Sequence, residues 1–191
     1  MKLPYVVAEI LAGVAEGEAT NIGVPMAIAV VDEEGGLQLF KRMDGTLPVS
    51  TELAVSKAYT SALLRMPTDK VGALSQPGEA LYGIQHTHGG KIILFGGGYP
   101  LCLDGEVVGA IGVSGGTVEQ DMLVAQPAVD MLNYVQCWAG EIKRLLPPAT
   151  RATFALPLLK EKLLRAFGEV TPEIPEATVA ALTGGVLLAL T

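Results

Sequence analysis

The chain has 191 residues, of which 50% are hydrophobic and 17% charged, enough for one well-buried core with an appendage. Its formal net charge of −7 and the absence of any Lys/Arg-rich run argue against nucleic acid and anionic membrane surfaces as partners. No apolar run reaches the roughly 20 residues of a membrane span, and residues 1–20 lack a secretory signal pattern. The two cysteines are not spaced as CxxC and suit a reducing compartment. We therefore expect a cytoplasmic protein.

The first half of the chain predicts helices on either side of a hairpin. Apolar residues between positions 6 and 14 have the spacing of one helix face, and the Asn-Ile-Gly turn at 21–23 ends that helix. Residues 24–32 and 37–42 predict two strands joined by a turn. Ser50 and Thr68 stand at the N-cap positions of two further helices.

The second half predicts three more strands and a long helix. The strands cover residues 91–95, 99–103 and 106–114, and Asp104-Gly105 predicts a two-residue hairpin turn between the last two. Thr117 and Gln120 have the capping-box form that opens a helix over residues 118–145. These elements predict an α+β fold with an antiparallel five-stranded sheet and flanking helices.

The sequence pattern changes after residue 146, where two prolines follow the last predicted helix of the core. We predict an α+β domain at residues 1–146 and a helical C-terminal extension at residues 147–191, because Pro147-Pro148 interrupts the preceding helix. The last 16 or so residues are strongly apolar. Two interpretations remain open: the extension packs on its own core or on a symmetry mate, or it docks into the groove of a partner.

A glycine-rich segment links the last predicted strand to the last core helix. Gly109, Gly112, Gly115 and Gly116 fit close packing followed by a turn. They also fit a backbone cradle for an anion at a helix N-terminus, although the spacing matches neither dinucleotide nor P-loop fingerprints. Downstream, we interpret Glu119 and Asp121 as helix-capping charges.

Four stretches, in this order and almost without gaps, resemble the GlcG/HbpS-like haem-binding family, which includes the C-terminal domain of PduO-type proteins. They are VPMAIAVVDEEGGLQLFKRMDG from residue 24, STELAVSKAYTSALLRMPT from residue 50, PGEALYGIQHTHGGKIILFGGGYPL from residue 77 and DGEVVGAIGVSGGTVEQD from residue 104. The resemblance covers roughly residues 5–145. It implies a profilin-like, five-stranded domain that forms homo-oligomers, dimers or larger, and, for some members, haem binding with haem degradation or storage.

The two histidines, His86 and His88, are the candidate metal ligands. Both lie in the segment QHTHGG, which we expect to be extended, and they lack the i, i+4 spacing with which helical histidines share a metal, so they are not expected to hold one metal together. Either can serve as an axial ligand of haem iron, with the other axial position filled by a partner subunit. The alternative is a loop histidine that hydrogen-bonds the backbone.

Four other residues are candidates for cofactor binding. Arg42 belongs to an Arg-Met-Asp-Gly motif shared with the family, and it either forms a buried pair with Asp44 or binds a carboxylate or propionate. The family keeps a basic residue near the position of Lys57. On a helix expected to be buried, Lys57 either belongs to a binding site or extends its aliphatic chain so that the amine reaches solvent. Gly97 and Gly98 lie in the turn expected to line the pocket.

We therefore predict a haem or related tetrapyrrole-binding protein of a bacterial catabolic operon, with a corrinoid as the second candidate cofactor. One alternative is a non-catalytic oligomeric accessory protein that residues 170–191 attach to operon enzymes or to a bacterial microcompartment shell. Another is an enzyme that degrades haem or converts a small metabolite through Arg42, Lys57 and Asp44. The sequence patterns assign no catalytic residue.

Overall fold

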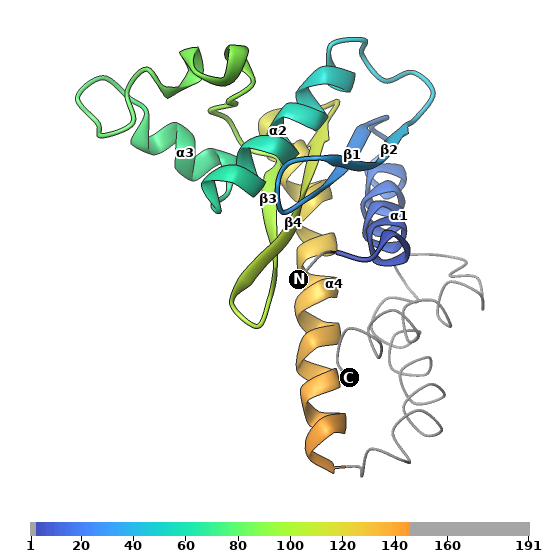
Figure 1. Ribbon diagram of the computed structural model, residues 1–191. Helices are drawn as coiled ribbons and strands as arrows, with labels where there is room; N and C mark the ends of the chain where they lie inside the picture. The colour runs from blue at the N-terminus through green and yellow to red at the C-terminus, as the bar shows by residue number, and fades with distance from the viewer. Residues whose placement is uncertain (1–2, 146–191) are drawn as a thin grey trace.

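The computed structural model describes residues 3–145, which form a sheet with helices on both faces (Figure 1). The predicted C-terminal extension, residues 147–191, lies outside the described residues. In chain order the elements are α1 (Tyr5–Asn21), β1 (Ala27–Asp32), β2 (Leu37–Arg42), α2 (Ser50–Leu64), α3 (Thr68–Leu74), the 3-10 turns η1 (Ile84–His86) and η2 (His88–Gly90), β3 (Gly98–Leu103), β4 (Glu106–Ser114) and α4 (Val118–Leu145).

Two hairpins build the sheet, whose strand order is β2-β1-β4-β3 with every neighbouring pair antiparallel. The hairpins join through β1 and β4, where Ala27 pairs with Ser114. In the second hairpin Asp104 and Gly105 both have positive φ, 51° and 82°, as the predicted two-residue turn requires. The Gln136 side chain of α4 donates to the Asp104 carboxylate at 2.9 Å and fixes this turn to the helix.

Helix α2 covers one face of the sheet, and α1 and α4 cover the other (Figure 1). The α2 side is lined by small side chains: Ala27, Ala29, Val31 and Ala110 from the strands and Ala54, Ala58 and Ala62 from α2. A Cβ atom on Gly112 would come within 2.5 Å of the Ala58 backbone nitrogen, so the helix backbone lies almost directly on β4. This close approach brings Lys57, next to Ala58, to the end of that strand.

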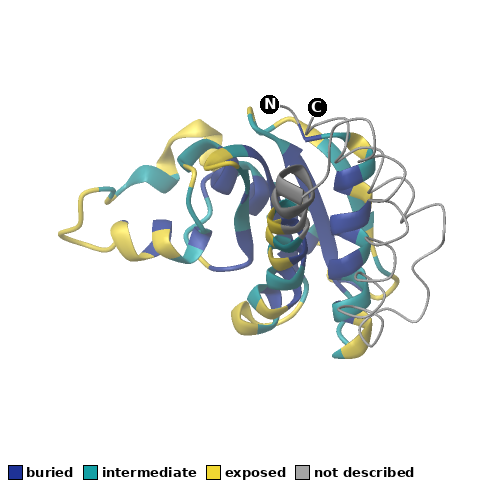
Figure 2. Ribbon diagram, turned by 90° about the horizontal axis from the view of Figure 1, so that it is seen from below, coloured by how far each residue is buried: buried dark blue, intermediate teal, exposed yellow. Residues whose placement is uncertain are grey.

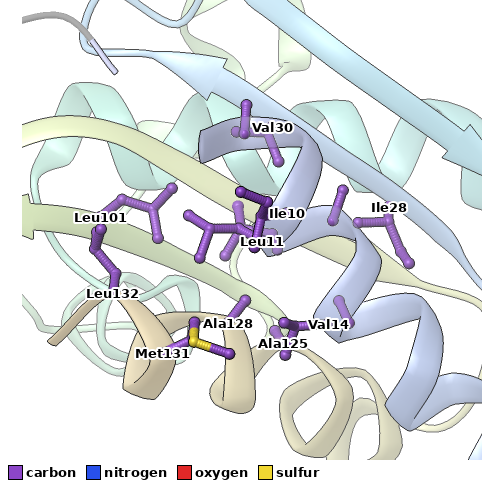
Figure 3. Close-up of a cluster of buried hydrophobic side chains, with 14 of the residues drawn as sticks. Ile10, Leu11, Val14, Ile28, Val30, Leu101, Ala125, Ala128, Met131 and Leu132 are labelled. Atoms are coloured by element: carbon purple, nitrogen blue, oxygen red, sulfur yellow. The ribbon is translucent and has the colours of Figure 1, made fainter. Parts of the chain in front are cut away.

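The opposite face holds the larger hydrophobic core. Figure 3 shows side chains of α1, the strands and α4 meeting there, among them Leu11, Ile28, Leu101 and Met131. All four are fully buried or nearly so. Burial of apolar surface on this scale is the main force that holds the two helices against the sheet.

The sheet has four strands, and the prediction of a fifth at residues 91–95 is wrong. The Thr60 hydroxyl of α2 accepts a hydrogen bond from the Ile93 N–H at 3.0 Å, while its own proton has the Ser56 carbonyl oxygen at 2.7 Å and the Lys91 carbonyl oxygen at 3.3 Å as acceptors. A helix side chain thus provides an acceptor that a neighbouring strand would otherwise supply. The α+β class, the antiparallel sheet and the flanking helices are confirmed.

The predicted helix starts have mixed outcomes. The capping box is confirmed, since the Thr117 N–H donates to Gln120 Oε1 at 2.9 Å and the Gln120 N–H to Thr117 Oγ1 at 3.3 Å. Ser50 is not an N-cap: it is the first helical residue, and its N–H already donates to the Leu47 carbonyl in the preceding turn. Thr68 is likewise the first residue of α3, and its hydroxyl has a partner elsewhere.

An excursion over residues 65–95 projects from the core between α2 and β3. In Figure 2 it forms the mostly exposed arm on the left, whereas the sheet beside it is buried. It includes α3 and both 3-10 turns, and its Tyr82 side chain is 65% exposed. Across residues 3–145, no helix combines the length and apolar character needed to cross a membrane.

Candidate functional site

A buried ion pair between Lys57 of α2 and Asp121 of α4 is the main polar feature of the core. Lys57 is 0% exposed, and its Nζ lies 2.5 Å from Asp121 Oδ2 and 2.9 Å from the Val113 carbonyl oxygen. The Phe95 ring covers the ammonium group, with its centroid 4.9 Å away. The amine therefore has a carboxylate, a carbonyl and an aromatic face around it.

The second oxygen of Asp121 satisfies the backbone at the start of α4. The amides of Gly115 and Gly116 both donate to Oδ1 at 3.0 Å. These are the amides predicted to cradle an external anion, and a side chain of the same chain already occupies them. The interpretation of Asp121 as a charge that caps the helix is confirmed, but Asp121 also binds Lys57.

The glycine turn before β3 rests directly on this pair. Gly97 is buried with φ 111°, and a Cβ atom there would lie 2.8 Å from Lys57 Nζ and 2.7 Å from the Val113 carbonyl oxygen. The amide of Gly98 donates to Thr68 Oγ1 at 3.0 Å. Lys57, Gly97 and Gly98 are therefore brought together as predicted, although all three are buried and pack against protein atoms.

Desolvation acts against both charges of the pair. Burial lowers the pKa of Lys57 below its ordinary 10.5, and this effect exceeds the opposing hydrogen bond and charge of Asp121. Burial also raises the pKa of Asp121 above its ordinary 3.8, despite its bonds to Lys57 and to the two glycine amides. The hydrogen bonds and the mutual attraction of the pair thus act against a larger cost of desolvation.

The two histidines lie apart from this buried cluster, at the surface of the excursion. His86 ends η1 and His88 begins η2, so the prediction of an extended segment is wrong: each lies in a tight turn, and His88 has φ 51°. Both are exposed. The His88 ring lies 6.2 Å from that of Tyr59 in α2, and its Nδ1 is 3.0 Å from the Thr87 hydroxyl.

Arg42 lies at the end of the edge strand β2 and is exposed. Its guanidinium donates to the Thr46 carbonyl at 3.1 Å. Ion pairs within residues 3–145 join Lys41 to Glu16, Lys57 to Asp121 and Lys70 to Asp69, so the alternative of a buried Arg42–Asp44 pair is wrong. The remaining guanidinium N–H groups of Arg42 are available to an external anion.

The predicted site residues thus form three groups rather than one pocket. Lys57 and the two glycines are buried, the histidines lie on the excursion, and Arg42 lies at the opposite edge of the sheet. Within the described part of the chain, three or more His, Cys, Asp or Glu side chains nowhere gather as a metal site would require. Sequence reasoning missed the contact of Asp121 with Lys57. A lysine on a buried helix needs a counter-charge, and Asp121, beside apolar positions of the last helix, was a candidate.

Comparison with known proteins places this architecture in a family. An uncharacterised 15.0 kDa protein from the dhaT-dhaS intergenic region of Citrobacter freundii is 46% identical over 123 residues, 64% of this chain and 87% of that protein. The corrinoid adenosyltransferase PduO of Salmonella typhimurium is 43% identical over 115 residues, 60% of this chain. Those residues span only 34% of PduO, so the match concerns one part of that enzyme.

Solved structures and a family model agree with these relatives. The crystal structure of a PduOC:heme complex superposes with a TM-score of 0.66 at 39% identity, over 68% of this chain and 94% of that one. Residues 3–130, more than half of the chain, match a family model described as haem degrading protein HbpS-like. The chain therefore belongs to the HbpS-like family of haem-degrading proteins.

Proposed function

We propose that this protein binds haem, with haem as the first and a corrinoid as the second candidate tetrapyrrole. The main support is the PduOC:heme complex, which shares 39% identity and the fold with this chain. The family description, haem degrading protein HbpS-like, points to the same cofactor. Degradation, as opposed to binding or storage, is the activity we would test next if binding is found.

The exposed residues suit such a cofactor. His86 and His88 present accessible imidazoles, which are suitable ligands for haem iron. Arg42 has free donors for a propionate, and the partly exposed rings of Tyr59 and Phe95 offer apolar surface. When bound, haem would supply redox and oxygen chemistry. Because these residues lie in separate places on one chain, we propose that a second copy completes the site in a homo-oligomer.

Histidine variants test this proposal. Haemin added to the wild type should give a sharp Soret band at saturation, and replacement of the axial histidine, by His86→Ala or His88→Ala, should weaken and shift it. Glu79→Ala, a change at an exposed position of the same excursion, is the control and should leave the spectrum unchanged. Wild-type spectra in both histidine variants would remove histidine ligation, and a parallel titration with cobalamin distinguishes the corrinoid alternative.

We propose a second role for the residues beyond the family domain. The family match ends at residue 130, and the apolar segment 170–191 follows well after it. Such a segment suits attachment to an operon enzyme or to a microcompartment shell, which would place the protein inside that compartment. Residues 170–191 fused to a fluorescent protein should co-localise with shells in cells that make them, and diffuse fluorescence beside intact shells would contradict this role.

A further inference from the structure

We infer that Lys57 and Asp121 form a clamp that positions the ligand-binding surface without touching the ligand. The clamp is defined as this ion pair together with the Gly96–Gly98 turn that lies on it. The inference rests on the proposed function for the ligand, but its structural half can be measured without any ligand. Neither residue would be a catalytic residue; both would act through the turn and through Phe95.

The geometry shows four segments meeting at the pair. Lys57 comes from α2 and Asp121 from α4, the Val113 carbonyl marks the end of β4, and Oδ1 of Asp121 holds the amides of Gly115 and Gly116. Both carboxylate oxygens are therefore in use. The Lys57 ammonium group donates to acceptors inside the core. Because Lys57 belongs to α2 and Asp121 to α4, the pair links the helices on the two faces of the sheet.

Two hydrogen bonds and one close contact hold the turn against the pair. The Gly97 carbonyl accepts a hydrogen bond from the Val113 N–H at 2.8 Å, and the Gly98 amide donates to Thr68 Oγ1 at 3.0 Å. A Cβ on Gly97 would overlap Lys57 Nζ at 2.8 Å. Phe95, two residues earlier, places its ring over the same ammonium group while 39% of the residue stays exposed.

The clamp is therefore one of several attachments that hold the histidine loop. The Tyr59 ring of α2 contacts His88 and the Lys91 amine, the Thr60 hydroxyl binds the Ile93 N–H, and the clamp binds the chain again at Phe95 and the turn. Residues 86–90, which include both histidines, are exposed. If the clamp opens, Phe95 and the residues that precede it lose this attachment to the core.

Stability alone is a weak reason for burying such a pair. Taking two charges out of water costs several kcal/mol per ion, and apolar replacements of buried pairs are often neutral or stabilising. In some proteins a buried polar group instead selects one conformation over others. Here the conformation that the pair would select is that of the Gly96–Gly98 turn. This distinction makes the inference testable.

The test compares Lys57→Met, Asp121→Asn and the double variant with the wild type, using Lys70→Met as a control at an exposed lysine. Each single variant should lower the melting temperature by roughly 10 °C, because it leaves one buried charge uncompensated. The double variant should recover part of that loss. In all three variants, however, hydrogen exchange of the Gly98 and Val113 amides, measured by NMR, should be about tenfold faster than in the wild type, because the turn no longer packs against the ion pair.

Haemin titrations of the same samples give the second readout. The double variant should bind haemin about fivefold more weakly than the wild type or Lys70→Met, even where its melting temperature recovers. Recovery of amide exchange and haemin affinity along with melting temperature would overturn the inference, because the pair would then contribute stability only. Unchanged exchange in every variant would also overturn it. A wild type that binds no haemin would refute the proposed function, whereas amide exchange would still decide whether the clamp exists.

Discussion

Gly97 illustrates how strongly a single residue is constrained by the buried pair. Its backbone has φ 111°, and it lies against both Lys57 Nζ and the Val113 carbonyl oxygen. Sequence reasoning placed Gly97 at a cofactor pocket. The structure instead gives it a packing reason, since only a residue without a side chain can occupy this position. A functional and a packing glycine look alike in one sequence.

Gly97→Ala should therefore destabilise the protein by about 2–4 kcal/mol, from backbone strain together with displacement of the lysine amine. Gly13→Ala is the matched control: Gly13 lies inside α1 with no atom within 4 Å of its Cβ position, so alanine should stabilise by about 0.5–1 kcal/mol. Urea unfolding of both variants measures the difference. Equal effects of the two changes would contradict the packing described for Gly97.

The lowered pKa of Lys57 predicts a pH effect on the free energy of unfolding. Between the folded-state pKa and the ordinary value of 10.5, the unfolded chain binds more protons than the folded one. The contribution of Lys57 to stability should thus rise with pH across that window. We expect the wild type to gain stability relative to Lys57→Met as pH increases towards the ordinary value of 10.5, in urea titrations at matched ionic strength. A difference that falls with pH would show that Lys57 is stabilised in its charged form.

Among the elements, those encoded by local patterns were predicted and those set by distant partners were not. The α1 stripe, both hairpins and the capping box of α4 follow from periodicity and turn chemistry, and all are confirmed. The apolar run at residues 91–95 satisfies the same rules for a strand. The hydroxyl of Thr60, about thirty residues earlier, nevertheless accepts the hydrogen bond of its Ile93 N–H. The Lys57–Asp121 contact spans 64 residues, and no local pattern encodes such a pairing.

Replacing Thr60 by valine tests the explanation for the missing strand. Valine keeps the shape of threonine but removes the acceptor for the Ile93 N–H, so Thr60→Val should cost about 1–3 kcal/mol in unfolding free energy. Thr20→Val is the control, because the Thr20 hydroxyl bonds only to the Glu16 carbonyl at an exposed site of α1. A cost no larger than that of the control would mean that the segment is held by the burial of Ile92 instead.

At the scale of the whole molecule, the candidate ligand residues are dispersed. The histidines lie on an exposed excursion, Arg42 lies at the far edge of the sheet, and the buried lysine sits between them under Phe95. The sequence predicted which family the domain belongs to, because motifs spread over its whole length match in order, and that prediction is confirmed. The sequence did not predict how the site residues are distributed in space. The profilin-like comparison, the oligomer and the extension at residues 147–191 stay predictions.

The most direct measurement is a haemin titration of the purified full chain, with absorbance and the mass of the complex recorded on the same sample. The account predicts a sharp Soret shift that saturates near one haemin per protomer or per dimer, on a species heavier than the 19.9 kDa monomer. Saturation on a monomer would refute a site shared between copies. A shallow, non-saturating response at every protein concentration would contradict tetrapyrrole binding itself.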